Sequence, residues 1–200
     1  MLRRWKEEKG EYRGVIFVRN DSELKEIRQL GGRVIALDEP TSTSGYLLPM
    51  GALMEAGLRV RPLKETSTSV SLAADEVGYL FAGDEETVFF WVLRGKAAAG
   101  AIHEGKFERF RKGHPEQCTA IFTTASVPRH VVCHRRDLDS QRTTAVREVL
   151  LGMEQTASGR EALRKFQRTT KFDEIPGGAD AALHPVRRSM RLLESLGIPQ

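Results

Sequence analysis

Residues 30–49 read LGGRVIALDEPTSTSGYLLP, and this stretch decides the fold prediction. The apolar, β-branched run Arg33–Leu37 predicts a buried strand. A polar loop follows, and the apolar spacing of Leu47–Leu58 then predicts a helix. Between the two, Thr41–Tyr46 places a run of hydroxyl side chains and a glycine. A strand, a loop and a helix in this order form the repeating unit of α/β folds.

The hydroxyl run carries the clearest chemistry in the chain. The first turn of a helix has N–H groups without helical partners and a partial positive charge. Ser42, Thr43 and Ser44 can therefore cap the helix, or donate hydrogen bonds to a bound anion beside the backbone N–H groups. Gly45 lets the backbone approach a ligand closely. The residues alone leave both interpretations open, a plain helix cap and an anion-binding loop.

Strands and helices alternate on both sides of this stretch, which predicts an α/β fold with a mainly parallel sheet. The first ten residues are charged and predict a solvated leader that can be helical. The other predicted strands are Gly14–Arg19, Val77–Phe81, Ala98–Ile102, Thr119–Thr123 and His130–Cys133. The other predicted helices are Glu23–Leu30, Glu85–Leu93 and a helical tail from Leu138 to the end.

Composition excludes several classes of protein. The 200 residues include 31 Lys and Arg against 27 Asp and Glu, for a net charge of +4, without a dense basic block that would mark a nucleic-acid face. No apolar run reaches the length of a membrane span, and the charged start MLRRWKEEKG is not a signal peptide. Two cysteines, Cys118 and Cys133, rule out a disulfide-rich scaffold, and their spacing leaves open whether they pair.

Other chemical motifs are incomplete. Gly100–Lys106 has the spacing of a phosphate-binding P-loop, but Phe107 stands where a Ser or Thr would hold Mg²⁺. Histidines and cysteines cluster at His114, Cys118, His130, Cys133 and His134, but on a strand Cys133 and His134 point to opposite faces, which argues against a metal site. We find no nucleophile elbow and no Ser/His/Asp arrangement. We therefore expect no catalytic residues, no metal and no cofactor.

Several motifs resemble those of one protein family in the same order along the chain. The segments are YRGVIFVRNDSEL (Tyr12–Leu24), LGGRVIALDEPTSTSGYLLP (Leu30–Pro49), VLRGKAAAGA (Val92–Ala101), SVPRHVVCHRRDLD (Ser126–Asp139), FDEIP (Phe172–Pro176) and HPVRRSMRLL (His184–Leu193). Together they resemble the phosphate/phosphite/phosphonate substrate-binding proteins of ABC transporters, a branch of the two-lobed periplasmic binding proteins. The segment with Ser-Thr-Ser-Gly-Tyr is the most specific of them.

The resemblance implies a lobe of the type II periplasmic-binding-protein fold, with a mixed, mainly parallel sheet and a C-terminal helical tail. Residues 1–12 would end a first lobe, residues 13–130 would form the second lobe with the hinge strands, and residues 131–200 would pack on the first lobe. The relatives have about a hundred further residues in the first lobe, a typical size for such a unit. We therefore expect most of that lobe to be missing and an apolar surface to be uncovered.

The resemblance also implies a binding site. Ser42, Thr43 and Ser44 would hold a tetrahedral oxyanion, Gly45 would permit the approach, and Tyr46 would serve packing. Two further positions depart from the family. Glu85 stands where many members have a histidine, and it either faces the ligand, caps its helix or points to solvent. The pair Arg129-His130 stands where an acidic residue is common, which makes His130 a further ligand-binding candidate.

The predicted function is that of a partial solute-binding component of an ABC importer for phosphate, phosphite or phosphonate. The implied partners are the small oxyanion, the membrane permease and a second copy of the chain joined through the uncovered surface, and no nucleic acid. The family resemblance implies a periplasmic or lipoprotein-anchored location, although the chain has no export signal. The alternatives are a ligand-sensing domain of a signalling system, a non-binding remnant and, least favoured, an enzyme on the same fold.

Overall fold

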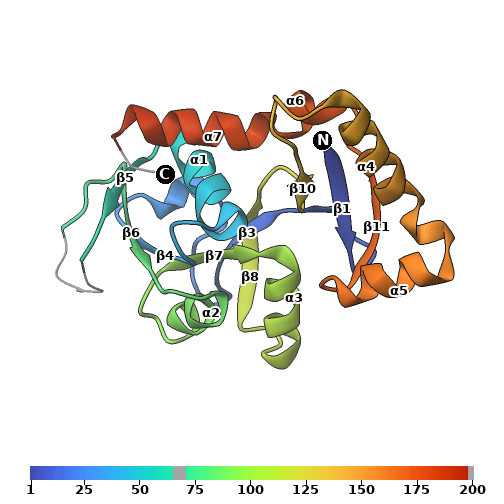
Figure 1. The fold of residues 1–200 in the computed structure, drawn as a ribbon. Coiled ribbons are helices and arrows are strands. Elements are labelled where there is room, and N and C mark those ends of the chain that lie inside the picture. The colour runs from blue at the N-terminus through green and yellow to red at the C-terminus, as the bar shows by residue number, and fades with distance from the viewer. Residues whose placement is uncertain (65–70, 198–200) are drawn as a thin grey trace. The chain divides into compact units, whose positions relative to one another are not determined.

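The computed structural model describes residues 1–64 and 71–197. The chain divides into two units, coloured along the chain in Figure 1. Unit 1 consists of Met1–Tyr12 and Ser126–His184, and unit 2 consists of Arg13–Ala125 and Pro185–Gln200. Both units are discontinuous, so the polypeptide passes from one to the other three times.

Unit 2 is built on a six-stranded sheet with the order β5-β6-β4-β7-β3-β8. The strands are β3 (Gly14–Arg19), β4 (Val34–Leu37), β5 (Arg59–Pro62), β6 (Glu76–Phe81), β7 (Ala99–His103) and β8 (Cys118–Thr123). The pairs β5·β6, β6·β4 and β4·β7 are parallel, while β7·β3 and β3·β8 are antiparallel. The predicted mixed, mainly parallel sheet is confirmed.

Helices cover both faces of this sheet. They are η1 (Ile27–Leu30), η2 (Thr43–Leu47), α1 (Leu48–Glu55), α2 (Glu85–Leu93), α3 (Glu104–Gly113) and α7 (His184–Ser195). Successive side chains of a strand point to opposite faces. Accordingly, Ile16 and Val18 of β3 pack in the core cluster that contains Leu193 of α7, whereas Val15 and Phe17 pack in the cluster with α2 and α3. Figure 1 shows α1 and α7 along one face and α2 and α3 along the other.

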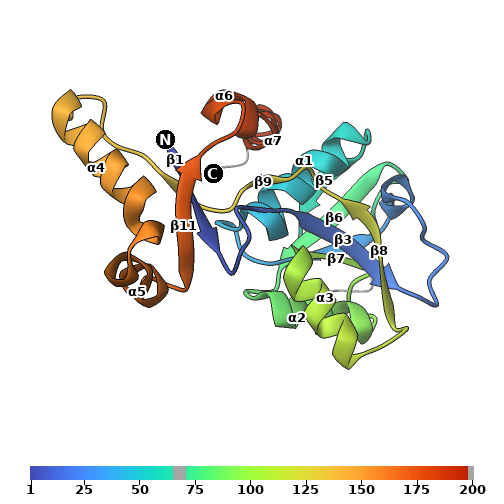
Figure 2. The same cartoon turned by 90° about the vertical axis from the view of Figure 1, so that its right-hand side faces the viewer.

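Unit 1 is smaller and contains two short antiparallel sheets. The first has the order β10-β1-β11, and the second pairs β2 with β9. The strands are β1 (Leu2–Lys6), β2 (Glu11–Tyr12), β9 (Val127–Pro128), β10 (Val131–Val132) and β11 (Thr169–Glu174). The helices are α4 (Ser140–Gly152), η3 (Met153–Gln155), α5 (Ala157–Lys165) and α6 (Gly178–Ala182), and Figure 2 shows α4 and α5 beside β11. Leu2, Leu163 and Phe172 form the core of this unit.

The prediction of a solvated leader was wrong, because residues 2–6 form the central strand of unit 1. Leu2 is buried in the core of unit 1. Arg3 is buried as well, and it is paired with Glu11 and Asp173. A strand that buries arginines looks solvated in the sequence, because the carboxylates that neutralise one of them lie elsewhere in the chain.

Three further differences concern the helices and their neighbours. The predicted helix Glu23–Leu30 is reduced to the single turn η1, which Gly32 ends with a φ of +73°. The predicted strand His130–Cys133 shrinks to β10. The expected helical tail contains the strand β11, whose residues Thr169 and Phe172 are buried.

The last helix, α7, groups with unit 2 rather than with the rest of the predicted tail. Leu193 lies in the core of unit 2. A Cβ added at Gly51 would stand 2.2 Å from the Ser189 hydroxyl, so α7 lies directly against α1. Across residues 1–64 and 71–197, no helix combines the length and the apolarity needed to cross a membrane.

Candidate functional site

The predicted loop lies at the carboxyl edge of the parallel part of the unit 2 sheet. β4 ends at Leu37 and leads into the loop, and its parallel neighbour β6 ends at Phe81 and leads into α2. Two backbone hydrogen bonds, Ala82 N to Leu37 O and Gly83 N to Asp38 O, hold the two strand ends together. In open α/β sheets, ligands bind at this edge, outside the carboxyl ends of the strands.

The loop enters its helix through a wide turn. Ser42 is the N-cap residue, and its hydroxyl accepts a hydrogen bond from the Gly45 N–H at 3.0 Å. The Leu47 N–H donates to the Ser42 carbonyl at 3.0 Å, which is the i to i+5 pattern of a π-helix. The helix therefore begins at Thr43 as η2 and continues as α1, earlier than the predicted start. Single π turns occur frequently at functional sites.

Gly45 is required by the packing of the loop. An added Cβ would lie 2.5 Å from the Asp38 Cβ and 3.0 Å from the Ser42 hydroxyl oxygen. The Asp38 N–H also donates to the Gly45 carbonyl at 3.3 Å, so the loop folds back onto the end of β4. At Gly14 of β3, an added Cβ would stand 2.1 Å from the Ser44 carbonyl oxygen. Ser44 and Gly45 are consequently buried.

Tyr46 serves packing, as predicted. It is 2% exposed and belongs to the larger core cluster of unit 2. Its ring meets the Phe81 ring edge-on at 5.0 Å between centroids, and it lies 6.4 Å from the Tyr79 ring. Burial raises the pKa of Tyr46, so its hydroxyl stays protonated. The buried Tyr46 ring therefore packs the loop against β6.

Asp38 is a site residue that the sequence reasoning missed. Burial raises the pKa of its carboxyl, the charges of Glu39 and Asp84 raise it further, and a hydrogen bond from the Ser42 hydroxyl opposes the rise. The Ser42 hydroxyl thus donates to Asp38 while it accepts from Gly45. The position of an acid directly after a buried strand and before the hydroxyl run was the available signal. Ser42 organises the loop, which leaves Thr43 and Ser44 as the better candidate donors.

Glu85 ties three elements together. Its Oε1 accepts from the backbone N–H of His103 at 2.9 Å, and its Oε2 lies 3.9 Å from Lys106 Nζ. The N-cap of α2 is instead Asp84, whose carboxylate accepts from the Thr87 N–H at 2.8 Å. The interpretation of Glu85 as a helix cap was therefore wrong, as was that of a solvent-facing side chain, because its side chain is only 20% exposed. Glu85 joins α2 to the end of β7 and the start of α3.

Glu85 and Asp38 line the same hollow in unit 2, which has a volume of about 290 Å³. Its lining residues are Asp38, Glu39, Gly83, Asp84, Glu85, Glu86, Lys106, Arg109 and Phe110. Five carboxyl groups therefore face two cationic side chains. Like charges repel most strongly where solvent is scarce. Binding of a dianionic ligand is therefore favourable only at the helix start, or when a proton or a cation binds with it.

His130 belongs to unit 1, whereas the other five candidates belong to unit 2. Desolvation, together with the positive charges of Arg4, Arg129 and Lys6, lowers the pKa of His130 to about 4. The imidazole is therefore neutral at neutral pH. The His130 backbone carbonyl accepts from the Arg4 N–H at 2.9 Å, which places this residue beside β1.

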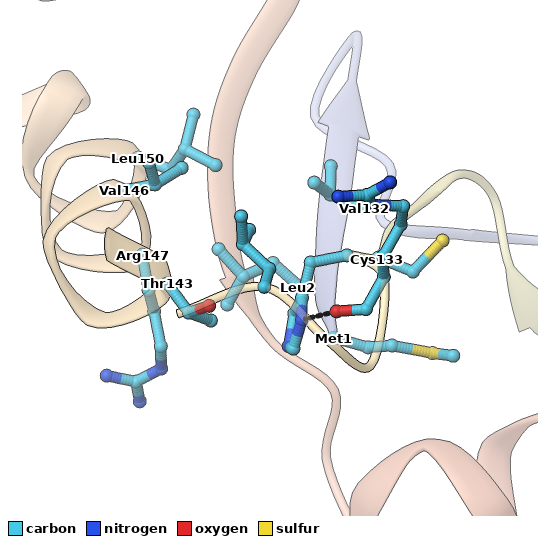
Figure 3. Close-up of a pocket in the computed structure, with 11 residues that line it drawn as sticks. Met1, Leu2, Val132, Cys133, Thr143, Val146, Arg147 and Leu150 are labelled. Carbon is cyan, nitrogen blue, oxygen red and sulfur yellow. Dashed lines mark hydrogen bonds between the residues drawn. The ribbon is translucent and has the colours of Figure 1, made fainter. Parts of the chain in front are cut away.

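A second hollow, of about 320 Å³, lies within unit 1 (Figure 3). It is lined by Met1, Leu2, Val132, Cys133, His134, Arg135, Leu138, Thr143, Val146, Arg147 and Leu150. Its lining is mostly apolar and includes none of the predicted site residues. Cys133 and Cys118 are both free, and burial raises the pKa of the Cys118 thiol to about 11. Over the described parts of the chain, no group of His, Cys, Asp or Glu is arranged to hold a metal ion.

The mixed sheet and the loop at its carboxyl edge define the class of protein, a type II periplasmic binding protein. A family model described as the periplasmic substrate-binding protein of phosphonate ABC transporters matches residues 1–176. The chain belongs to this family. The family's proteins bind a small phosphonate ligand, work with an ABC permease and are periplasmic.

Solved structures agree with this assignment. XAC2383 from Xanthomonas citri, in a structure bound to ATP, is 27% identical with a TM-score of 0.86, and the match covers 96% of this chain and 71% of that one. PhnD1 from Prochlorococcus marinus, in complex with methylphosphonate, is 17% identical with a TM-score of 0.61 and coverages of 100% and 72%. A phosphonate-transporter binding protein from Pseudomonas aeruginosa is 16% identical with a TM-score of 0.56 and coverages of 96% and 61%.

Proposed function

We propose that the chain binds a small tetrahedral oxyanion, of the phosphonate or phosphate kind, at the start of η2. The observation that carries the proposal is the hydroxyl loop itself. It forms a helix N-terminus at the carboxyl edge of two neighbouring parallel strands, β4 and β6. Such an N-terminus offers backbone N–H groups and a partial positive charge to an anion.

Each loop residue has a distinct role in this proposal. Thr43 and Ser44 donate their hydroxyl and backbone protons to the oxyanion. Ser42 holds the turn through its bonds to Gly45 and Asp38, and Gly45 allows the close approach. Asp38 takes up a proton when the anion arrives, since its pKa is already raised and a neighbouring negative charge raises it more. This proton removes one negative charge from the acidic hollow, so an anionic ligand is repelled less.

Glu85 and His130 take supporting roles in the proposal. Glu85 fixes the wall of the hollow through the His103 N–H, and its own negative charge excludes ligands with a second anionic group on that side. His130 is neutral at neutral pH and can either donate or accept a hydrogen bond. We propose it as a separate polar ligand-binding candidate within unit 1.

At the level of the cell, we propose that the chain delivers its oxyanion to the permease of an importer. A second copy of the chain covers the exposed apolar side chains of α4, where Val146 is 56% and Val149 is 66% exposed. The structure of XAC2383 with ATP supports a second candidate ligand, a nucleotide that would present its phosphate groups to the same loop.

Titration calorimetry tests the proposal with methylphosphonate, inorganic phosphate, phosphite and ATP as separate ligands. Thr43→Val removes one hydroxyl donor and is expected to weaken binding about tenfold, since a hydrogen bond to a charged group contributes about 1.5 kcal/mol. Thr43→Glu places a carboxylate in the site and should abolish binding. Thr41→Glu, which adds the same charge at an exposed position two residues earlier, serves as the matched control.

The outcomes separate clearly. Binding that survives in Thr43→Glu with unchanged affinity removes the loop from the site. Equal losses in Thr41→Glu and Thr43→Glu would mean that net charge, rather than position, decides. If the wild-type chain gives no heat with any of the four ligands, the proposal of an oxyanion-binding protein is wrong for this chain.

A further inference from the structure

Two consecutive arginines of β1 are both buried, and they differ in whether a carboxylate neutralises their charge. Arg3 is 6% exposed and Arg4 is 3% exposed. Because successive side chains of a strand point to opposite faces, they enter different surroundings. On the face of Arg4, Leu2 and Phe172 form the core of unit 1. This pair provides an internal comparison for what a buried guanidinium needs.

Arg3 is fully neutralised. Its Nε and Nη2 donate to the two carboxylate oxygens of Asp173 at 3.0 and 2.7 Å, and its Nη1 donates to Glu11 at 2.7 Å. The hydrogen bond to Asp173 raises the pKa of Arg3, despite its burial. This is the two-pronged geometry in which arginine binds carboxylates and phosphates best.

Arg4 has no such partner. Its Nη1 donates to the neutral amide oxygen of Gln167 at 3.1 Å, and its guanidinium lies 5.2 Å from the centre of the Phe166 ring. Its Nε is buried without a hydrogen-bond partner among the described residues. Burial lowers the pKa of Arg4, and the nearby charge of Arg129 lowers it further.

The surroundings of Arg4 add positive charge rather than remove it. Arg4, Arg129 and Lys6 together depress the pKa of the His130 ring, which desolvation has already lowered. Four carboxylates of unit 1 on or next to β1 and β11 are paired with other arginines. The pairs are Glu7 with Arg168, Glu11 and Asp173 with Arg3, and Glu174 with Arg147. Within the described residues, no carboxylate forms an ion pair with Arg4.

An arginine cannot relieve this situation by losing its proton, because its pKa lies above the physiological range even when it is lowered. A buried charge without a counter-charge is costly, and an arriving anion removes that cost. The Nε side of the guanidinium is the edge that lacks a partner, and Nε together with Nη2 forms the fork that grips an oxyanion.

We propose that Arg4, with Arg129 and Lys6 nearby, forms a second anion-binding site that lies within unit 1 and takes a phosphoryl group. The site is separate from the loop of unit 2, so this proposal does not depend on the proposed function. The phosphoryl group can belong to free inorganic phosphate or to a phosphorylated small molecule, and the experiment distinguishes these sources.

The test is thermal unfolding of the full chain with the Trp91→Phe substitution, which leaves Trp5 of β1 as the fluorescent reporter of unit 1. Inorganic phosphate and ATP are titrated separately against sodium chloride of equal ionic strength. We expect phosphate to raise the unfolding temperature of unit 1. A rise with ATP at concentrations at least tenfold lower would identify a phosphorylated small molecule as the ligand.

Arg4→Met keeps the length of the side chain and removes its charge. Without phosphate, this variant should unfold at a higher temperature than the parent chain, because an uncompensated buried charge has gone. With phosphate, its shift should vanish. Arg4→Lys keeps the charge without the fork, and the phosphate concentration that gives half the shift should rise at least tenfold.

Two controls complete the design. Arg168→Met removes a cation from the same unit, exposed and already paired with Glu7, and should leave the response to phosphate unchanged. Thr43→Glu should also leave it unchanged, since it affects only the loop of unit 2. The proposal is overturned if the response persists in Arg4→Met, or if Arg168→Met loses it equally. If Arg4→Met does not fold, an unchanged half-shift concentration in Arg4→Lys overturns it.

Discussion

Replacing Gly45 by alanine should destabilise unit 2 by about 3 kcal/mol, because other atoms already occupy the space of the new methyl group. The added Cβ would lie 2.5 Å from the Cβ of Asp38. That neighbour is fixed to the backbone, so no side-chain rotation can clear the overlap. Either the end of β4 or the first turn of η2 has to move.

The magnitude follows from two contributions. Forcing an extra methyl group into a packed site costs about 2 kcal/mol. Moving Gly45 also lengthens the hydrogen bond between its N–H and the Ser42 hydroxyl, and the loss of such an N-cap costs about 1 kcal/mol. For a protein of this size, a loss of about 3 kcal/mol corresponds to a fall of about 6–12 °C in Tm.

The two tryptophans allow each unit to be followed separately. Trp5 lies in β1 of unit 1 and Trp91 in α2 of unit 2, so Trp5→Phe leaves a reporter of unit 2 alone. Gly113→Ala is the matched control in the same unit. Nothing lies within 4 Å of a Cβ at this helical position, so the change should cost nothing or stabilise slightly.

A second substitution tests the cause directly. Asp38→Ala keeps the offending Cβ and should not rescue Gly45→Ala. Asp38→Gly removes it, so the double variant should be at least about 1 kcal/mol more stable than the sum of the two single changes predicts. An unaltered Tm in Gly45→Ala would refute the packing argument. Equal behaviour of the two Asp38 variants would show that the overlap is not the source of the loss.

Three further predictions concern the same loop and the apolar face of α4. Ser42→Ala should lower the free energy of unfolding by about 1–2 kcal/mol, since the Gly45 N–H loses its acceptor and Asp38 loses its donor. Urea unfolding followed at Trp91 measures this loss, and a change within experimental error would contradict the role of Ser42 as the cap. Asp38 has a raised pKa, so the folded chain holds this proton more tightly than the unfolded chain and stability falls as the pH rises through that pKa. Asp38→Asn should therefore gain on the parent chain in Tm as the pH rises above the ordinary pKa of an aspartate, about 4. A difference in Tm that stays constant with pH would refute this. Val146 and Val149 are more than half exposed, and their joint replacement by glutamate should shift the mass measured by light scattering toward the monomer, whereas an unchanged mass would exclude this face from self-association.

Local patterns predicted the part of the fold that positions the loop. The helix Glu85–Leu93 was placed with the observed bounds, since Asp84 caps it locally and its apolar residues are contiguous. The strand predicted at Arg33–Leu37 depends equally on neighbours in the chain. The helix that follows was predicted to start at Leu47, whereas it begins at Thr43, inside the hydroxyl run. The packing role of Tyr46 was also predicted, although its aromatic partners lie far along the chain on β6.

The failures share a different origin, because they depend on contacts between distant residues. β1 looked like a solvated leader, since the carboxylate of Asp173 that neutralises Arg3 lies 170 residues away. α3 was not predicted, although Phe107 and Phe110 have helical spacing; only Phe107 is fully buried. Glu85 was assigned by resemblance to the ligand site, and its bond to the His103 N–H could not be inferred without the register of β7.

The central position of β1 in unit 1 has a consequence for how the chain folds as it is made. Its two strand partners pair at Leu2 with Val132 and with Glu174, so neither exists when β1 leaves the ribosome. At about 5–20 residues per second, synthesis of the 170 residues that separate Arg3 from Asp173 takes about 10–30 s. Most of unit 2 is complete well before that. The charged sequence LRRWK keeps β1 hydrated until its partner strands are made. The arginines that are buried in the folded protein therefore protect the unpaired strand of the nascent chain from aggregation.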